Sequence, residues 1–240
     1  MSLQLVPPQV QPPLDESFRP AILANQNFQR EVESIGVQLV LGLERNGSEF
    51  SRFETKVYPE DHANFAANYQ YIERIVKFLL WQRGGHTLYV GGSHKIAEYL
   101  RKTYSADGAK SFDYKFMGEQ VYEKDFSVIA CGVDEVPAAH ETGKLLGRNL
   151  QGHRIGFDLG ASDRKVSAVV DGIPIYSEEV VWEPRKNSTP DYHYREIMAA
   201  LKTAASKMPR VDAIGGSSAG LYSWRRATRG SIRVARRAGR

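Results

Sequence analysis

The sequence predicts an α/β protein built from two parts, and three observations support this. Apolar residues at strand spacing and at helix spacing alternate along residues 36–131. Residues 154–181 then contain three consecutive strand patterns separated by short turns. A helical pattern beginning at Pro190 follows, and a further strand comes after it. We therefore expect an N-terminal α/β region over residues 21–150 and a second domain, with the element order βββαβ, over residues 151–220.

The N-terminus and the cysteine content indicate where the protein works. Residues 1–20 are rich in proline and polar residues, so we expect an extended or disordered leader. This leader has neither the basic region nor the apolar block of a secretory signal, and no apolar run approaches the ~18 residues of a membrane span. Cys131 is the single cysteine, which excludes an internal disulfide and fits a reducing compartment. We expect a cytoplasmic protein without a membrane partner.

The net charge of +4 comes from the end of the chain. Residues 221–240 contain seven arginines and no lysine, aspartate or glutamate, which leaves 25 basic and 28 acidic residues in the rest. The body of the protein is therefore mildly acidic, and this excludes a broad basic surface for nucleic acid. The composition leaves a homo-oligomer open.

The N-terminal region begins with a predicted hairpin, formed by strands at 36–43 and 49–57. Helical spacing over 61–82 predicts a long helix, which Gly84 and Gly85 end. A short buried strand follows at 87–90.

The segment Gly91-Gly92-Ser93 then begins a helix that extends to about Thr103, with Ser93 as its N-cap. This segment is either an ordinary αβ turn or an anion site at a helix N-terminus, although it lacks the lysine of a P-loop. Strands at 112–116 and 126–131, and a short helix at 138–146, complete the region. None of these elements carries an assignable chemistry.

The second domain starts with a strand at 154–159 that ends in a D-x-G-x-S turn. Backbone N–H groups of Gly160, Ala161 and Ser162 could point at one anion, and Ser162 adds a hydroxyl donor. Asp158 would repel a bare phosphate, so its presence favours an intervening Mg²⁺ ion. The pattern is that of a nucleotide-phosphate site, and the alternative is an ordinary polar hairpin.

The sequence also predicts the other two strands of this segment and the helix that follows them. A second strand occupies 165–170, and Asp171-Gly172 is a strong two-residue hairpin signal because both positions tolerate a positive φ. A third strand occupies 173–181. Thr189 is the expected N-cap of the next helix and Pro190 its first residue, and Met208-Pro209 ends it.

The run I-G-F-D-L-G-A-S-D-R-K-V-S-A-V-V-D-G resembles the first phosphate motif of the sugar kinase, Hsp70 and actin superfamily. It is most similar to the ROK family of sugar kinases and repressors, whose pattern is D-x-G-G-T followed by a basic residue. Asp158 matches the family's Mg²⁺-associated aspartate, Gly160 its first glycine and Ser162 its threonine. Lys165 falls near the basic position.

Two residues depart from the family pattern, since Ala161 replaces the second glycine and Asp163 adds a negative charge. The resemblance, which covers residues 153–220, implies the first part of an RNase H-like ATPase domain. It also implies that a glycine-rich turn after the fourth strand lies beside the substrate. This second candidate site contains Gly216, Ser217, Ser218 and Gly220.

The resemblance implies transfer of the γ-phosphoryl group of ATP to a sugar hydroxyl, with ATP and Mg²⁺ as cofactors. Asp158 would position the metal ion, and the 160–162 turn would contact phosphate. The family's catalytic aspartate follows in a later part of the fold that this chain lacks. We therefore expect a truncated or frame-shifted sequence that is inactive alone, with residues 221–240 out of frame. The alternative is a genuine basic tail for nucleic acid or an anionic membrane.

Two further functions stay open. Residues 216–220 also match the G-x-S-x-G nucleophile elbow of serine hydrolases, with Ser218 as nucleophile and upstream partners such as His193 or Asp212. The second open function is that of a non-catalytic relative that binds a sugar or nucleotide, because such folds can lose catalysis and keep binding.

Overall fold

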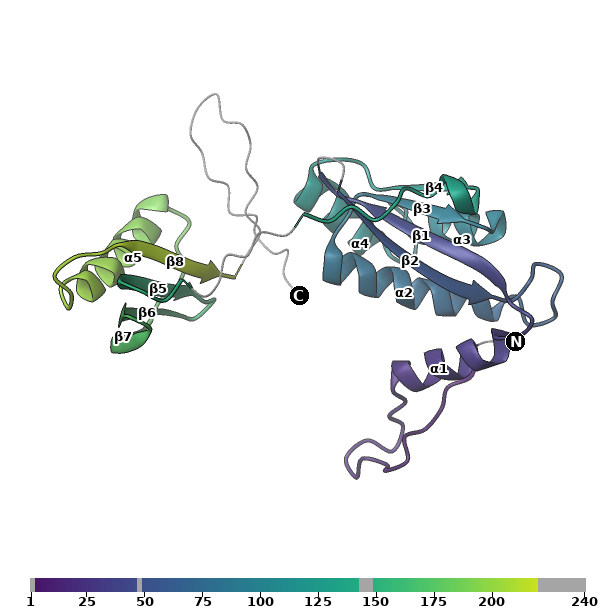
Figure 1. Cartoon of the computed structure of the whole chain (residues 1–240), viewed down its shortest axis with the longest axis horizontal. Helices are drawn as coiled ribbons and strands as arrows, with labels where there is room; N and C mark the ends of the chain where they lie inside the picture. Colours follow the sequence, from purple (N-terminus) through teal and green to yellow (C-terminus); the bar gives the residue numbers. More distant parts are fainter. Residues whose placement is uncertain (1–2, 47–48, 143–148, 220–240) are drawn as a thin grey trace. The chain divides into compact units, whose positions relative to one another are not determined.

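The computed structural model describes residues 3–46, 49–142 and 149–219, which belong to two compact units (Figure 1). The N-terminal unit lies within residues 1–143 and the C-terminal unit within residues 144–240. Each unit contains a four-stranded sheet with both parallel and antiparallel pairs. The predicted α/β class and its division into two parts are confirmed at this level.

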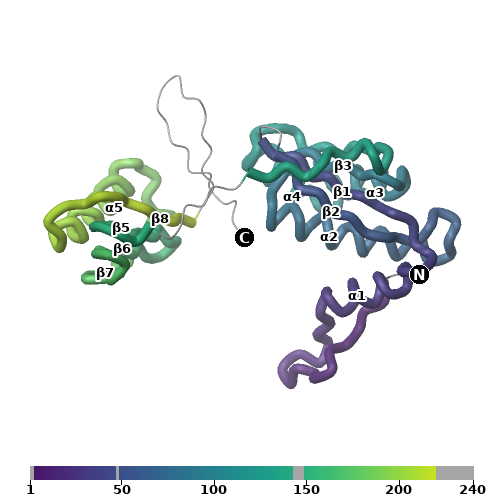
Figure 2. The backbone as a smooth tube through the Cα atoms, in the orientation of Figure 1, coloured from purple at the N-terminus to yellow at the C-terminus, as the bar shows by residue number. Residues whose placement is uncertain are grey.

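The sheet of the N-terminal unit has the order β2-β1-β3-β4. Its strands are β1 (Val37–Glu44), β2 (Phe50–Val57), β3 (Thr87–Gly91) and β4 (Ser127–Cys131), and Figure 2 shows the path of the chain between them. Strand β1 pairs antiparallel with β2 and β3, whereas β3 and β4 are parallel. The predicted hairpin and both later strands are present.

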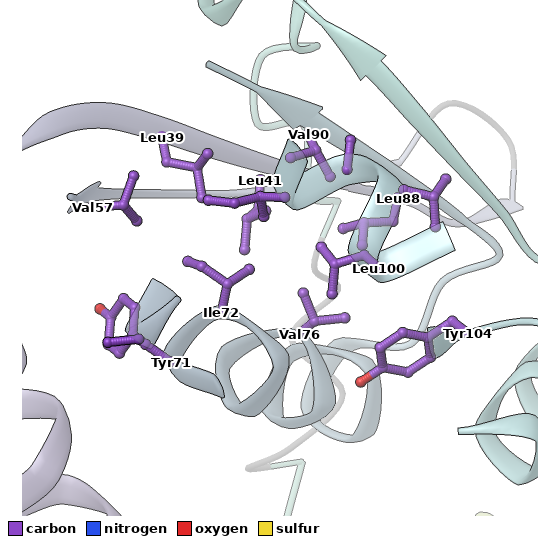
Figure 3. Packing of buried hydrophobic residues seen from close by; sticks show 14 of the residues in the cluster. Leu39, Leu41, Val57, Tyr71, Ile72, Val76, Leu88, Val90, Leu100 and Tyr104 are labelled. Atoms are coloured by element: carbon purple, nitrogen blue, oxygen red, sulfur yellow. The ribbon is translucent and has the colours of Figure 1, made fainter. Parts of the chain in front are cut away.

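Three helices supply the core of this unit: α1 (Ala21–Val32), α2 (Ala67–Arg83) and α3 (His94–Thr103). Apolar residues at helical spacing on α2 face alternate residues of β1, because side chains on one face of a strand recur every second residue. Figure 3 shows this packing, which includes Leu39, Leu41, Ile72, Val76, Leu88 and Leu100.

The turn before α3 is an ordinary αβ turn. Ser93 caps the helix as predicted, since its Oγ accepts the N–H of Ile96 at 3.4 Å. The same hydroxyl donates to Glu60 Oε1 at 2.8 Å, and Lys95 pairs with that carboxylate at 3.4 Å. Because a carboxylate of the protein already lies at this helix N-terminus, the geometry favours the ordinary turn over the anion site.

The expected strand at 112–116 is wrong. These residues form α4 (Ser111–Lys115), which continues into a π-helical segment (Phe116–Tyr122). Phe112 and Phe116 are four positions apart, so both lie on one helix face, where each stacks on Trp81. Asp113 is buried and accepts hydrogen bonds from Lys77 and Trp81. The alternation F-D-Y-K-F fits a strand, whereas the four-residue spacing of its two phenylalanines fits a helix, and tertiary contacts decided between them.

Other expectations for this unit also need correction. Helix α1 was not predicted, α2 begins at Ala67 instead of residue 61, and residues 138–142 are extended instead of helical. The remainder of that expected helix, residues 143–146, lies outside the described residues. Residues 3–20 contain neither helix nor strand, as expected, but Leu3 is buried in the core and its N–H donates to Gln70.

The C-terminal unit has the element order β5 (His153–Leu159), β6 (Asp163–Val170), β7 (Ile173–Val181), α5 (Pro190–Ala205) and β8 (Ala213–Ser218). The predicted order βββαβ is therefore confirmed. The sheet order is β7-β6-β5-β8, in which β5 pairs antiparallel with β6 and parallel with β8. Helix α5 covers one face of this sheet, and the buried cluster contains Ile155, Val166, Ala168, Ala200, Ala204 and Met208.

Two turn signals in this unit match their predictions. Asp171 and Gly172 have φ values of 51° and 85°, as the two-residue hairpin requires. Pro190 is the first residue of α5, although the side chain of Thr189 makes no capping hydrogen bond. Local sequence therefore set where these elements begin.

The glycine-rich turn expected after the last strand is instead part of that strand. Gly216, Ser217 and Ser218 belong to β8 and pair with Phe157, Asp158 and Leu159 of β5. Pairing with the inner strand β5 overrides the low strand propensity of glycine. A Cβ atom on Gly216 would overlap the ring of Phe157, so glycine here lets that ring pack over the strand. Gly220 lies outside the described residues.

Candidate functional site

The C-terminal unit places Asp158 beside Ser217. The two residues are register partners in the parallel β5–β8 pair, and the Ser217 hydroxyl donates to Asp158 Oδ1 at 2.5 Å. Both lie one residue before the ends of their strands. In open α/β sheets, ligands bind beyond the carboxyl ends of parallel strands. The two candidate sites of the sequence analysis therefore form one site.

Asp158 lies on the sheet face away from α5. Ile155 and Phe157 pack toward the helix, and side chains alternate along a strand, so Gly156 and Asp158 point to the opposite face. Register pairing places Ser217, Asp158, Lys165 and Glu179 in one row across all four strands. This polar row has one residue from each strand.

Lys165 is engaged within the protein. Its Nζ lies 2.9 Å from Asp163 Oδ1 and 3.9 Å from Glu179 Oε1. The hydrogen bond to Asp163 is the main cause that raises the pKa of Lys165, and the same bond lowers the pKa of Asp163. Lys165 is thus a cation held beside Asp158, and Asp163 already balances part of its charge.

A row of small residues lies next to the polar row. It consists of Gly215, Gly156, Ser167 and Ser177, which register pairing places side by side. A Cβ atom on Gly156 or Gly215 would meet no described atom within 4 Å. Glycine inside a strand often marks a place where a ligand or another backbone approaches closely. An open hollow here is lined by residues that include Gly156, Asp158, Lys165, Ser167, Ser177 and Glu179.

The turn at 160–162 differs from the predicted anion cradle. The N–H of Gly160 donates to the carbonyl of Asp163 at 2.9 Å, so this amide is not available to a phosphate. A Cβ atom at Gly160 would lie 2.8 Å from the same carbonyl oxygen. Glycine at this position is therefore explained by the tight turn, and the expected donation by all three amides is wrong for Gly160.

Trp182 holds the same turn and was missed by the sequence analysis. Its Nε1 donates to the Gly160 carbonyl at 2.9 Å, and its backbone N–H donates to the Ser162 carbonyl at 3.0 Å. The side chain is only 5% exposed, although it follows an edge strand. The tryptophan directly after a predicted strand was the only sequence signal for this contact. It could not identify the partner, because Gly160 lies 22 positions away.

The remaining groups of the turn fit a phosphate. In the described part of the chain, no acceptor contacts the N–H of Ala161 or Ser162. The Ser162 hydroxyl makes only a long hydrogen bond, of 3.3 Å, to Asp163 Oδ2. Two amides could therefore donate to phosphate oxygens at the end of β5, and the Ser162 hydroxyl could do so by giving up its long bond to Asp163.

The residues also fit Mg²⁺ that arrives together with a nucleotide. Mg²⁺ in phosphate sites is held by one or two carboxylates plus phosphates and water. Asp158 supplies one such carboxylate on the open face, with Ser217 fixing one of its oxygens. Within residues 3–46, 49–142 and 149–219, no three His, Cys, Asp or Glu residues gather as a metal cage. These donors fit an Mg²⁺ ion that is held jointly by Asp158 and the nucleotide phosphates better than an ion bound by the protein alone.

The hydrolase alternative finds little support in the geometry. Ser218 lies within β8 and not on a strained strand-to-helix turn. His193 Nε2 lies 3.0 Å from the Asn187 carbonyl, and Asp212 accepts from Arg210 and from the His153 N–H. The Arg210 contact is the main reason that the pKa of Asp212 falls to about 2. Neither proposed partner contacts Ser218.

No family model matches the chain, and no curated protein matches it. None of the helices in the described ranges is both long enough and apolar enough to cross a membrane.

Proposed function

We propose that the C-terminal unit binds the phosphates of Mg²⁺-ATP and is the first part of an RNase H-like ATPase domain similar to that of ROK sugar kinases. One observation carries the proposal: Asp158 and Ser217 meet at the carboxyl ends of two parallel strands, on a sheet face beside two sterically unexplained glycines. That position is where α/β sheets bind ligands. In a ROK-like reaction, the acceptor would be a sugar hydroxyl.

The topology supports the fold part of this proposal. Three consecutive antiparallel strands are followed by a helix and by a fourth strand, which returns parallel to the first. The resemblance of residues 153–220 to the sugar kinase superfamily implies this order. The first strand therefore lies inside the sheet, where its end can carry a binding residue.

The chain's own residues would act on the phosphates by position and charge. Bound Mg²⁺ would supply neutralisation of the phosphate oxygens. The Ser217 hydroxyl would hold the Asp158 carboxylate in one orientation toward the ion. Amides of Ala161 and Ser162 would donate to phosphate oxygens, while Lys165, held by Asp163, would contribute a fixed positive charge nearby.

A non-catalytic nucleotide-binding relative is the second candidate. It is favoured because the Gly160 amide and Lys165 are both engaged inside the protein. Each would otherwise add to transition-state stabilisation in a kinase. Such a relative would bind Mg²⁺-ATP without transferring its phosphoryl group.

Calorimetric titration of Mg²⁺-ATP into the chain tests the proposal, with Asp158→Asn as the variant. Asp191→Asn, which changes an exposed carboxylate in the first turn of α5, is the matched control. We expect binding by the wild type and the control, and at least tenfold weaker binding by Asp158→Asn. Equal binding by all three proteins, or no binding by the folded wild type, would overturn the proposal. Hexose-dependent release of ADP would favour a kinase over a non-catalytic binder.

A further inference from the structure

The N-terminal unit contains a cavity that the sequence analysis did not find. It has a volume of ≈ 590 Å³ and lies between α1, β2, α2 and residues 139–141. Apolar side chains form much of its wall: Ile22, Phe53, Ile75, Phe78 and Leu79. Cavities of about 300–1,000 Å³ with apolar walls and a few polar groups are typical of small-molecule sites.

Arg74, on α2, brings an unpaired positive charge to this wall. Its Nη1 atom is buried and has no hydrogen-bond partner. Among the described residues, no carboxylate lies within ion-pair distance of its guanidinium. A buried guanidinium nitrogen without a hydrogen-bond partner is unfavourable, so an anion in the cavity would supply an acceptor that the described residues do not provide.

The other charged groups on the wall are already paired. Arg52 contacts Glu54 at 2.8 Å and donates to the Val136 carbonyl at 2.7 Å. Arg83 donates to Glu141 Oε2 at 3.1 Å. The cavity therefore has one uncompensated guanidinium, which matches a singly charged ligand group better than a phosphate.

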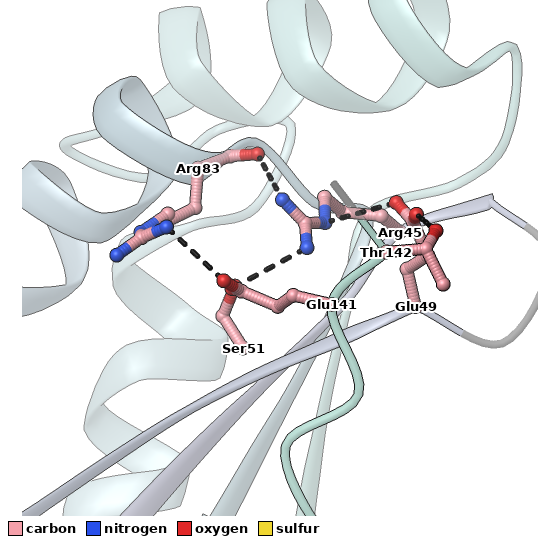
Figure 4. Close-up of polar contacts among 6 residues, drawn as sticks. All are labelled: Arg45, Glu49, Ser51, Arg83, Glu141 and Thr142. Carbon is pink, nitrogen blue, oxygen red and sulfur yellow. Dashed lines mark hydrogen bonds and ion pairs between the residues drawn. The ribbon is translucent and has the colours of Figure 1, made fainter. Parts of the chain in front are cut away.

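Residues 139–141 are fixed in place as part of the wall. Figure 4 shows that Glu141 accepts from Ser51 and Arg83 and pairs with Arg45, whose Nη2 lies 3.4 Å away. The backbone of His140 exchanges two hydrogen bonds with Phe50, both of 2.9 Å. Because four residues from three parts of the unit hold this segment, the cavity is formed before any ligand arrives, which lowers the cost of binding.

Asn25, on α1, supplies a second polar group to the wall. Its Oδ1 atom is also buried without a partner. Since an amide can be turned to present either its oxygen or its nitrogen, Asn25 can accept from or donate to a ligand. The two wall residues with a buried polar atom that lacks a partner, Asn25 and Arg74, thus come from two different helices and could together orient a ligand.

We propose that this cavity binds a small monocarboxylic acid with an apolar body. The carboxylate pairs with Arg74, for which a planar guanidinium is well suited, and Asn25 contacts the same end of the ligand. The apolar body packs on Ile75, Phe78 and Leu79. This site is in the N-terminal unit and does not depend on the proposed phosphate site.

Calorimetric titration with 3-phenylpropanoate and octanoate tests the proposal on the full chain. The corresponding primary amides keep the apolar bodies and lose the charge. We expect each acid to bind at least tenfold more tightly than its amide, and this ratio to fall close to one in Arg74→Met. Arg30→Met, which changes an exposed arginine near the end of α1, should leave the ratio unchanged.

Several results would overturn the proposal. They are equal binding of acid and amide, binding of neither acid, or an unchanged ratio in Arg74→Met. Tighter binding of inorganic phosphate than of both acids would replace the carboxylate with a phosphate ligand. Thermal unfolding checks that Arg74→Met is folded, which we expect because the substitution removes an unpaired charge.

Discussion

Ser217 and Asp158 are joined by a hydrogen bond of 2.5 Å although 59 positions separate them in the chain. The bond exists because β5 and β8 are parallel neighbours in a register that places these residues opposite each other. It connects the two candidate sites of the sequence analysis. The first prediction therefore concerns this pair.

Ser217→Ala should weaken binding of Mg²⁺-ATP about tenfold. Hydrogen bonds to a charged group contribute about 1.5–3 kcal/mol, and an exposed bond lies at the lower end of this range. The free energy of unfolding should change little, since Ser217 is exposed. Ser206→Ala is the control, because Ser206 is exposed at the end of α5, outside the hollow, and its hydroxyl donates to the Thr203 carbonyl. A loss of affinity that is equal in both variants would contradict the role given to Ser217.

Glycines at two positions of the sheet should respond in opposite ways to alanine. Gly156→Ala should be neutral or raise the free energy of unfolding by about 0.5–1 kcal/mol, because the new Cβ meets no described atom. Gly216→Ala should lower it by about 1–3 kcal/mol, because the Cβ overlaps the Phe157 ring. Urea unfolding measures both values.

Binding of Mg²⁺-ATP provides a second test of Gly156→Ala. If a nucleotide lies close to the strand backbone, Gly156→Ala should reduce Mg²⁺-ATP affinity while the protein stays folded. A stable Gly156→Ala protein with full affinity would show that the open face at this residue is not used.

His86 should make stability depend on pH. The ring is 4% exposed, its Nδ1 lies 2.9 Å from Thr87 Oγ1, and its Nε2 lies 3.0 Å from Lys124 Nζ. Burial, followed by repulsion from Lys124, lowers the pKa of His86 below its ordinary value of 6.5. The unfolded chain then binds the proton more readily than the folded one. The stabilisation is therefore complete above pH 6.5 and is lost as pH falls through the lowered pKa.

Urea unfolding of the wild type and His86→Gln between pH 8 and pH 5 measures this effect. The difference between the two proteins should shrink steadily below pH 6.5, and NMR titration should show that His86 protonates below that pH. Lys124→Met should move the midpoint upward, because one cause of the depressed pKa is removed. A His86 midpoint at or above 6.5 in the wild type would contradict the prediction.

Asp113→Ala should destabilise the N-terminal unit by about 2–3 kcal/mol. The Asp113 side chain is 2% exposed, and it accepts from Trp81 Nε1 at 2.8 Å and pairs with Lys77. Removing it leaves the indole N–H without an acceptor. Lys77→Met should cost less, since the Lys77 side chain is 42% exposed and Trp81 keeps its partner. Chemical unfolding followed by Trp81 fluorescence reports both, and an equal cost would contradict this account.

The sequence by itself determined the elements whose signals are local. Alternation of apolar residues placed β1 to β3 and β5 to β7, and Ser93, Pro190 and Asp171-Gly172 marked helix starts and a hairpin. These signals act within a few residues, so no distant part of the chain can overrule them easily. The order βββαβ followed directly from them.

Only the tertiary structure decided which residues meet. The register of β5 and β8 placed Ser217 beside Asp158, and Trp182 held the Gly160 turn in which the expected amide donor is bonded to Asp163. Stacking on Trp81 favoured a helix at residues 112–116, where the sequence has strand-like spacing. Helices α1 and α2 together line the cavity that contains Arg74. These outcomes depend on contacts between residues far apart in sequence, and such contacts leave no periodic pattern in the chain.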